Sequence, residues 1–442
     1  MKKQYTFIFL VFLSIQYANA QFTISGEFRP RAEFRNGFNQ LIAEDQDPGF
    51  AISTRARLNT GYTTETFKIY LSLQDVLVWG ENRQIREVDD NNSFSVFEAW
   101  ASVKLGSDGW STKLGRQVIS YDDQRIFGGL AWAQQARNHD AALIQYKKNK
   151  FMLDAGFAFN QDFDSFGANI QGFINNGNAF LETPGFFTYK TMQYVYAKQK
   201  WEKFSGSVLF LNNGFQNFEA DVEPSPNTGD GTSNLQTFGT HLEYKSGIFD
   251  AAFNGYLQTG ERVNELEVDG AYLLGLDLGF KATKGLKLGV GAEIISGNDA
   301  DAGSTGAFFP LFGTNHKFNG LMDLFYVGNH ANSVGLVDIH VSANIKTGPG
   351  SNLFVKFLNF QGEQDTATGE SALGSEIDLV FNQNLKDGVN LKLGYSQFFT
   401  SDGIFDIPQG AIGEDAAADL QNWAWVMLTI KPKFFTSKPK EE

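Results

Sequence analysis

Residues 22–35 alternate strictly between apolar and polar or charged side chains. One parity carries Phe22, Ile24, Gly26, Phe28, Pro30, Ala32 and Phe34, and the other carries Thr23, Ser25, Glu27, Arg29, Arg31, Glu33 and Arg35. Because successive side chains of a strand point to opposite faces, this segment has one apolar face and one charged face. The same alternation recurs along the whole chain, in segments long enough to cross a bilayer as tilted strands.

Eighteen segments of the chain are predicted to be strands. They are residues 22–36, 50–63, 66–78, 94–105, 110–120, 139–148, 150–161, 190–201, 204–213, 235–246, 248–260, 270–282, 286–297, 335–347, 351–361, 372–384, 389–400 and 422–434. Short and long connections alternate between them: tight turns such as 148–149 and 284–285 are followed by long loops such as 162–189 and 298–334. This alternation is typical of a membrane β-barrel with short periplasmic turns and long external loops.

Two features qualify the strand count. Residues 319–327 could form one more strand, but an even count places them inside the long loop 298–334. A soluble propeller would instead require a repeat of about 40–50 residues, and no such repeat is visible. We therefore predict an all-β, transmembrane antiparallel barrel of about 18 strands.

The first 20 residues resemble an export signal. Lys2 and Lys3 precede a short apolar run, and Ala18-Asn19-Ala20 resembles a cleavage site. The mature chain is then expected to begin near Gln21 and to form one barrel domain over residues 21–442. No later stretch reaches 18 consecutive apolar residues, and there is no cysteine. We expect the bacterial outer membrane as the location, with its lipid and the barrel-assembly machinery as partners; Phe434 near the end of the last strand suits an assembly signal.

The charge of the chain is unevenly distributed. The formal net charge is −14, yet ten of the eleven arginines lie between Arg29 and Arg137. A charged side chain that faces lipid at the bilayer centre costs about 2–4 kcal/mol for Arg or Lys, so these residues are expected to face the lumen. The residues predicted to line a substrate path are Arg29, Arg31, Arg35, Arg55, Arg57, Lys68, Lys113, Arg116 and Arg125.

An arginine-lined, water-filled barrel would attract anions and pass carboxylated chains along several weak sites. The alternative is that Glu27, Glu33 and Glu98 pair with the arginines and brace the wall. The charge-rich stretch 121–128 lies in a loop that either folds into the pore as a constriction or remains external.

Enzymatic function has weak support. His340 and Ser342 share one strand face, as in the His-x-Ser arrangement of outer-membrane phospholipases, but polar lining of a lumen explains the same pattern. Hydrolase and nucleotide-binding motifs are absent. Asp299 and Asp301 form a poor calcium-loop pattern. We expect no catalytic residue, no cofactor, no metal site and no nucleic-acid partner.

Several segments together resemble the alginate-export porin family. They are Phe28-Arg29-Pro30-Arg31-Ala32-Glu33, Arg55-Ala56-Arg57-Leu58, Glu98-Ala99-Trp100, Lys113-Leu114-Gly115-Arg116-Gln117, residues 122–128, residues 313–320 and residues 374–379. The resemblance implies an 18-stranded outer-membrane barrel whose arginine-rich lumen passes a polyuronate. It also implies selectivity residues at Arg29, Arg31, Arg55, Arg57, Arg116 and Arg125.

The residues and the resemblance favour an outer-membrane channel for anionic solutes, with an acidic oligo- or polysaccharide as the solute. A general diffusion porin, with arginines balanced by acidic residues, is the alternative. A lipid hydrolase based on His340 and Ser342 is the third hypothesis.

Overall fold

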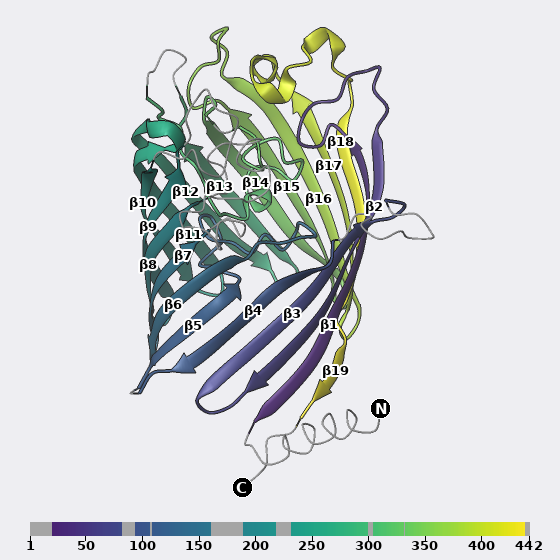
Figure 1. The fold of residues 1–442 in the computed structure, drawn as a ribbon. Coiled ribbons are helices and arrows are strands. Elements are labelled where there is room, and N and C mark those ends of the chain that lie inside the picture. Colours follow the sequence, from purple (N-terminus) through teal and green to yellow (C-terminus); the bar gives the residue numbers. More distant parts are fainter. Residues whose placement is uncertain are drawn as a thin grey trace.

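The computed structural model is a closed antiparallel β-barrel (Figure 1). It describes residues 20–81, 93–106, 108–160, 189–217, 231–298, 304–330 and 332–437. The strands are β1 (Gln21–Asn36), β2 (Gly49–Thr63), β3 (Phe67–Val78), β4 (Ser95–Lys104), β5 (Trp110–Gln117), β6 (His139–Lys148), β7 (Phe151–Phe159), β8 (Thr191–Lys200), β9 (Phe204–Gln216), β10 (Thr232–Lys245), β11 (Phe249–Arg262), β12 (Leu266–Thr283), β13 (Leu286–Ile295), β14 (Leu336–Gly348), β15 (Ser351–Gln361), β16 (Ala372–Lys386), β17 (Val389–Thr400), β18 (Gln421–Ile430) and β19 (Lys433–Thr436).

The barrel is closed by its first strand. Each of β1 to β17 pairs with the strand that follows it in the chain, and β1 also pairs with β18. The four-residue β19 continues the last strand after Pro432 and pairs with β1, with a register shift between Ile24 and Ser25. Proline lacks the N–H that a ladder needs, which explains why the predicted strand 422–434 is divided at this point.

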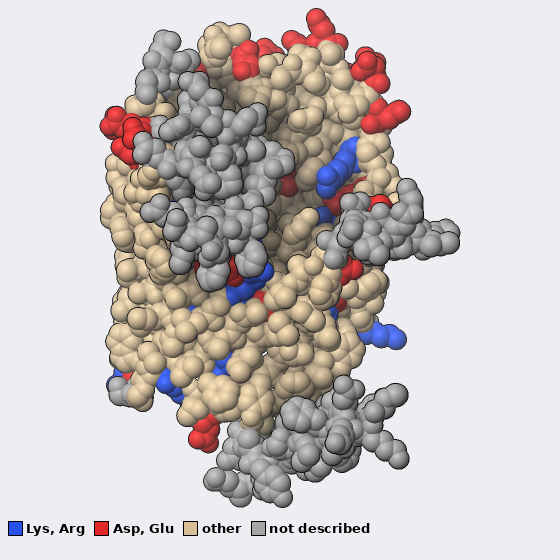
Figure 2. Space-filling view, viewed as in Figure 1, with Lys and Arg blue, Asp and Glu red and all other residues tan. Residues whose placement is uncertain are grey.

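The alternation read from the sequence separates an apolar exterior from a polar interior. Leu276 and Leu278 on β12, and Ile339 and Val341 on β14, are about half exposed, with exposed fractions of 46–53%. Asp338 and His340, which alternate with Ile339 and Val341 along β14, are buried inside the barrel. Figure 2 shows the outer wall as a surface nearly free of charged side chains, with acidic residues gathered at the rim that carries the long loops. Such a wall suits the hydrocarbon of a bilayer.

The predicted fold class is therefore confirmed. The short turns gather at one end of the barrel, where β1 begins and β19 ends, and the long loops gather at the other end (Figure 1). Residues 319–327 form no strand, as predicted. Several boundaries differ: β5 ends at Gln117, β9 ends at Gln216 and β10 begins at Thr232. β12 begins at Leu266, because its first residues pair with the end of β11 and with Thr305. The predicted signal, apart from Ala20, lies outside the described residues, as do Asp299 and Asp301.

The described part of the chain contains no helix that is long and apolar enough to cross a membrane.

Two long connections fold into the barrel and fill much of its lumen. We call residues 118–138, between β5 and β6, the first inserted loop, and residues 296–335, between β13 and β14, the second inserted loop. Phe127 of the first loop stacks on Phe312 of the second, with ring centroids 5.7 Å apart, and both rings are fully buried. The hydrophobic core of this protein thus lies inside the barrel, where the two loops pack against each other and against the wall.

Candidate functional site

The first inserted loop crosses the lumen and is attached to the wall at several points. Its backbone is unusual: four residues other than glycine, Asp122, Gln124, Leu130 and Ala136, have φ between +46° and +76°. This left-handed conformation is sterically costly for residues with a Cβ, so the surrounding contacts must hold the loop in place. The loop is therefore a fixed element of the pore rather than a solvated external segment.

One group of attachments joins the loop to β8–β11. The Asp122 carboxylate accepts hydrogen bonds from Tyr196 at 2.8 Å, Lys198 at 2.6 Å and Ser207 at 2.6 Å. The Asp123 carboxylate accepts one from Asn254 at 2.6 Å. Hydrogen bonds to a charged acceptor are roughly twice as strong as neutral ones, so this side of the loop is firmly held.

Arg125 joins the first inserted loop to the second. Its side chain is fully buried, ion-paired with Glu293 of β13 at 2.5 Å and hydrogen-bonded to Asn315 and Asn319 at 3.3 and 3.1 Å. Arg137 of the first loop donates to the Gly313 carbonyl at 3.0 Å, and burial lowers the pKa of Arg137 to about 10, so it stays charged at neutral pH. The two loops therefore form one unit.

The second inserted loop is attached to the opposite wall. The Glu376 carboxylate of β16 accepts a hydrogen bond from the Met322 N–H at 2.9 Å. Gly320 has a φ of +87°, and a Cβ there would lie 2.4 Å from a Glu376 oxygen. Only glycine fits between this carboxylate and the loop backbone.

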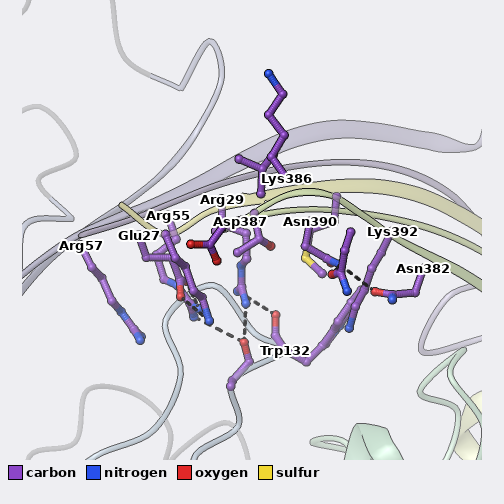
Figure 3. A pocket seen from close by; sticks show the side chains of 17 residues that line it. Glu27, Arg29, Arg55, Arg57, Trp132, Asn382, Lys386, Asp387, Asn390 and Lys392 are labelled. Atoms are coloured by element: carbon purple, nitrogen blue, oxygen red, sulfur yellow. Dashed lines mark hydrogen bonds and ion pairs between the residues drawn. The ribbon is translucent and has the colours of Figure 1, made fainter. Parts of the chain in front are cut away.

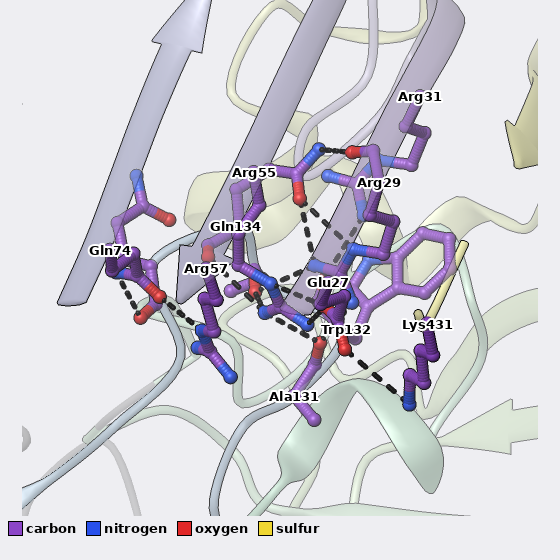
Figure 4. A network of polar contacts seen from close by, with 12 residues as sticks. Glu27, Arg29, Arg31, Arg55, Arg57, Gln74, Ala131, Trp132, Gln134 and Lys431 are labelled. Carbon is purple, nitrogen blue, oxygen red and sulfur yellow. Dashed lines mark hydrogen bonds and ion pairs between the residues drawn. The ribbon is translucent and has the colours of Figure 1, made fainter. Parts of the chain in front are cut away.

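The arginines of β1 and β2 form the third attachment, which we call the arginine wall: Arg29, Arg31, Arg55 and Arg57. Figure 4 shows Arg29, Arg31 and Arg55 directed towards the first inserted loop, where their guanidinium groups contact the backbone of residues 131–134. Arg29 donates to the Ala131 carbonyl at 2.6 Å, to the carbonyls of Trp132 and Ala133 at 3.1 Å, and to the Gln134 side chain at 2.8 Å. All of its donor nitrogens are used in this way.

The other members of the wall are also engaged. Arg55 is ion-paired with Glu27 and donates to the carbonyls of Ala133 and Gln134 at 3.2 Å. Arg31 pairs with Glu33 at 2.8 Å, donates to the Trp132 carbonyl at 2.9 Å and lies 4.3 Å above the Trp132 ring.

Arg57 has fewer partners. It donates to Gln74 at 2.7 Å and lies 3.6 Å from the centre of the Phe97 ring, and its buried Nη2 has no hydrogen-bond acceptor among the residues that the structure describes.

The segment 131–134 separates two cavities. The inner cavity, on the side of the short turns, has a volume of about 1020 Å³ and is lined by β1, β2 and β16–β18 (Figure 3). The outer cavity, on the side of the long loops, has a volume of about 540 Å³ and contains Arg31, Arg35, Phe38, Glu33 and Asp323 in its lining. Trp132 lines both cavities. The arginine wall and this tryptophan thus form the constriction of the lumen.

Three more of the predicted residues lie on the lumen side of the barrel: Arg35, Lys68 and Lys113. Arg35 lies in the outer cavity, about half exposed, and contacts Glu33 at 3.1 Å. Lys68 and Lys113 face Ser102 on neighbouring strands and lie on the lumen side, where Lys113 is 4.3 Å above the Trp100 ring.

Two of the predicted path residues are corrected by the structure. Arg116 lies on the outer face, because it shares the face of the exposed Leu114 and pairs with Asp140 of β6 at 2.8 Å. It stands at the loop end of β5, where the cost of a charge facing lipid is small. Arg125 is in the lumen but is wholly buried between the two loops and Glu293, so a solute has no access to it.

Sequence reasoning missed the acceptors that hold these arginines. The carbonyls of residues 131–134 leave no signal in the sequence, since every residue carries one. Glu293 and Glu376 gave a weak signal, because each stands at a lumen-facing position of an alternating strand. Trp132 was overlooked because it lies in a loop.

The hydrolase arrangement is not assembled. Both ring nitrogens of His340 contact carboxylates, Asp338 at 3.1 Å and Asp277 at 2.9 Å. Within the described ranges, no hydrogen bond joins His340 to Ser342, and no group of three or more His, Asp or Glu residues could hold a metal ion.

Comparison with known proteins agrees with this geometry. Residues 20–164 match the model of a family described as alginate export, the family indicated by the sequence motifs. No curated protein sequence matches the chain. Among solved structures, OccAB4 of Acinetobacter baumannii is similar with a TM-score of 0.61 and 13% identity, covering 94% of this chain and 98% of that one.

Two Pseudomonas aeruginosa proteins are also similar. OccK5 (OpdH) has a TM-score of 0.59 and 10% identity over 94% of this chain and 98% of its own. OpdK, solved with vanillate, has a TM-score of 0.56 and 10% identity over 93% of this chain and 99% of its own. The fold is that of these outer-membrane barrels. The closed wall with its apolar exterior, together with the match of residues 20–164, places the protein in the bacterial outer membrane.

Proposed function

We propose that the protein is an outer-membrane channel for anionic solutes and that the solute is a slender acidic oligo- or polysaccharide. The lining of the inner cavity carries this proposal. Its charged residues are Arg29, Arg55, Arg57, Lys386, Lys392 and Lys431 against only Glu27 and Asp387. The whole chain has a net charge of −14, so the basic lining is a local feature of the lumen.

A cavity of this kind raises the local concentration of anions. Charges of one sign in a cleft with low-dielectric walls focus the field and raise the local concentration of counter-ions. Several weak cationic positions in series also allow an anion to leave as easily as it arrives. The constriction formed by residues 131–134 and the arginine wall favours small or extended solutes over bulky ones.

The relatives support an anionic solute. The family matched by residues 20–164 is named for the export of alginate, an acidic polysaccharide. OpdK was solved with vanillate, which is a carboxylate. Outer-membrane lipid around the apolar wall and the barrel-assembly machinery are the expected partners of the barrel.

A general diffusion porin is the second candidate, and one observation favours it. Glu27 pairs with Arg55 and Glu33 pairs with both Arg31 and Arg35, so part of the basic charge is neutralised locally. If this neutralisation dominates, ions of either sign would pass.

A salt gradient across a planar bilayer separates the two candidates. We expect the purified barrel to give a reversal potential that indicates selectivity for anions. We also expect an oligouronate to block the current at concentrations where a neutral oligosaccharide of the same length does not. A reversal potential near zero together with equal block by the two sugars would reject the anion channel and favour general diffusion.

A further inference from the structure

Lysines occupy the lumen face at the short-turn end of several strands. They include Lys68 on β3, Lys147 on β6, Lys245 on β10, Lys287 on β13 and Lys346 on β14. We call this set, together with Lys392 on β17 and Lys431 after β18, the mouth lysines. The strands that carry them are distributed around the whole barrel (Figure 1).

The registers show that these side chains face inward. Residues directly opposite each other in antiparallel strands share a face. Arg31 of the arginine wall is opposite Met427, Met427 is opposite Lys392, and Lys392 is opposite Asn382. From Asn382 the same face continues through Asn352 to Lys346. The lysines of β14 and β17 therefore share the lumen face of the arginine wall.

The opposite side of the mouth is similar. Lys147 is opposite Met152, which is opposite Lys198. Lys147 and Lys198 line a cavity of about 430 Å³ with Lys150 and Lys200, and Asp122 is the only carboxylate among its lining residues. The basic charge of the lumen is therefore not limited to the first strands, where the arginines are concentrated.

The mouth lysines differ from the arginine wall in exposure and in partners. The side chains of Lys245 and Lys431 are 64% and 62% exposed, whereas those of Arg31 and Arg55 are 6% and 3% exposed. Lys245, Lys287 and Lys431 have carboxylate neighbours. Within the described residues, Lys68, Lys147 and Lys346 have no carboxylate within 4 Å.

We propose that the mouth lysines, and not the arginine wall, determine the anion selectivity of the channel. A charge selects ions when a passing ion can approach it, and rings of charged side chains act in this way in other pores. The donors of Arg29 and Arg55 are occupied by carbonyls and carboxylates, so these arginines hold the constriction in shape. The ammonium groups of Lys68, Lys147 and Lys346 are available to the solute. This inference rests on the proposed anion channel.

The test compares reversal potentials of four barrels under the same salt gradient at low ionic strength. They are the wild type, Lys68→Gln/Lys147→Gln/Lys346→Gln, the same three positions changed to Arg, and Arg29→Gln/Arg55→Gln. We expect the Gln variant to lose anion selectivity by on the order of tenfold, because the field of exposed charges concentrates counter-ions by at least this much. The Arg variant keeps the charge and should keep the selectivity. Arg29→Gln/Arg55→Gln should lose less selectivity than the lysine-to-Gln variant, because the donors of both arginines are already occupied.

Lys148 supplies a matched control. It is the neighbour of Lys147 but points to the other face of β6, where it pairs with Asp108 at 3.3 Å. Lys148→Gln should leave the reversal potential unchanged, and Lys147→Gln should reduce it. If the three-lysine Gln variant retains the wild-type potential while Arg29→Gln/Arg55→Gln loses it, the inference is wrong and the arginine wall is the filter. A wild type without anion selectivity would instead reject the proposed function itself.

Discussion

The lumen contains two sets of basic residues that use their charge differently. The arginine wall is buried and paired, and it contacts the backbone of the first inserted loop. The mouth lysines are exposed, and several of them have no carboxylate neighbour in the part of the chain that the structure describes. Guanidinium suits the first environment, because its planar donors can bind several acceptors at once and it is weakly hydrated. Ammonium on a flexible stem suits the second environment.

This difference suits the arginine wall to a structural role and the mouth lysines to a role in transport. A buried cation that is surrounded by acceptors stabilises the elements that supply those acceptors, and breaking such a pair leaves an uncompensated charge. An exposed cation contributes little to stability but remains available to ions in solution. Mutations in the two sets should therefore change different measured properties.

The largest effect is expected at Arg125. Changing Arg125 to Met leaves Glu293 buried without its cationic partner and should destabilise the joined loops by about 3–5 kcal/mol. The loops should then detach, giving faster proteolysis within residues 118–138 and a several-fold higher single-channel conductance.

A second substitution tests the cause. Adding Glu293→Gln to Arg125→Met removes the buried charge and should recover much of the lost protection. Equal proteolysis rates in the single and double variants would show that the ion pair does not hold the loops.

The next effect is expected at the arginine wall itself. Arg29→Gln/Arg55→Gln removes the donors to the carbonyls of residues 131–134, and each buried acceptor left unpaired costs about 1–3 kcal/mol. Conductance should rise and larger sugars should pass in liposome-swelling assays. Unchanged conductance would mean that Gln134 and Trp132 alone hold the constriction.

Acidification should loosen the second inserted loop through His330. Burial lowers the pKa of this imidazole to about 4, below its ordinary value near 6.5, and its Nε2 lies 2.8 Å from the Gly335 carbonyl. The folded loop favours neutral His330, and this preference contributes to the stability of the loop at neutral pH. The contribution is lost as the pH falls from about 6.5 towards 4, by about 3 kcal/mol in total. Conductance recorded from pH 7 to pH 4 should rise in the wild type, and His330→Gln should flatten that profile.

The smallest effect is expected at Arg116. Its ion pair with Asp140 is exposed, with 41% and 52% of the two side chains accessible, and such pairs contribute about 0–1 kcal/mol. Arg116→Gln should change neither the reversal potential nor the conductance. A shift in reversal potential would mean that Arg116 contributes to the field in the lumen despite its position on the outer face.

The sequence alone determined the wall of the barrel. A side-chain period of two fixes which face of each strand meets lipid, and the alternation of short and long connections fixes the order and direction of the strands. The inward positions of Lys68 and Lys113, and of the arginines on β1 and β2, follow from this local rule. Arg116 follows the same period, on the outward face of Leu114, and only the expectation that its charge faces the lumen was wrong, because pairing with Asp140 near the strand end makes an outward charge tolerable.

Only the tertiary structure decided what fills the lumen of the barrel. Whether residues 118–138 enter the lumen depends on contacts with β8–β11, with β13 and with the arginines of β1 and β2, which are distant in the sequence. The accessibility of a charged side chain is likewise a property of its neighbours: Arg29 and Lys346 both face the lumen, but only the arginine is covered by loop carbonyls. Alternation in a sequence specifies the face to which each side chain points. The burial of that side chain depends on which distant segments come to lie against it.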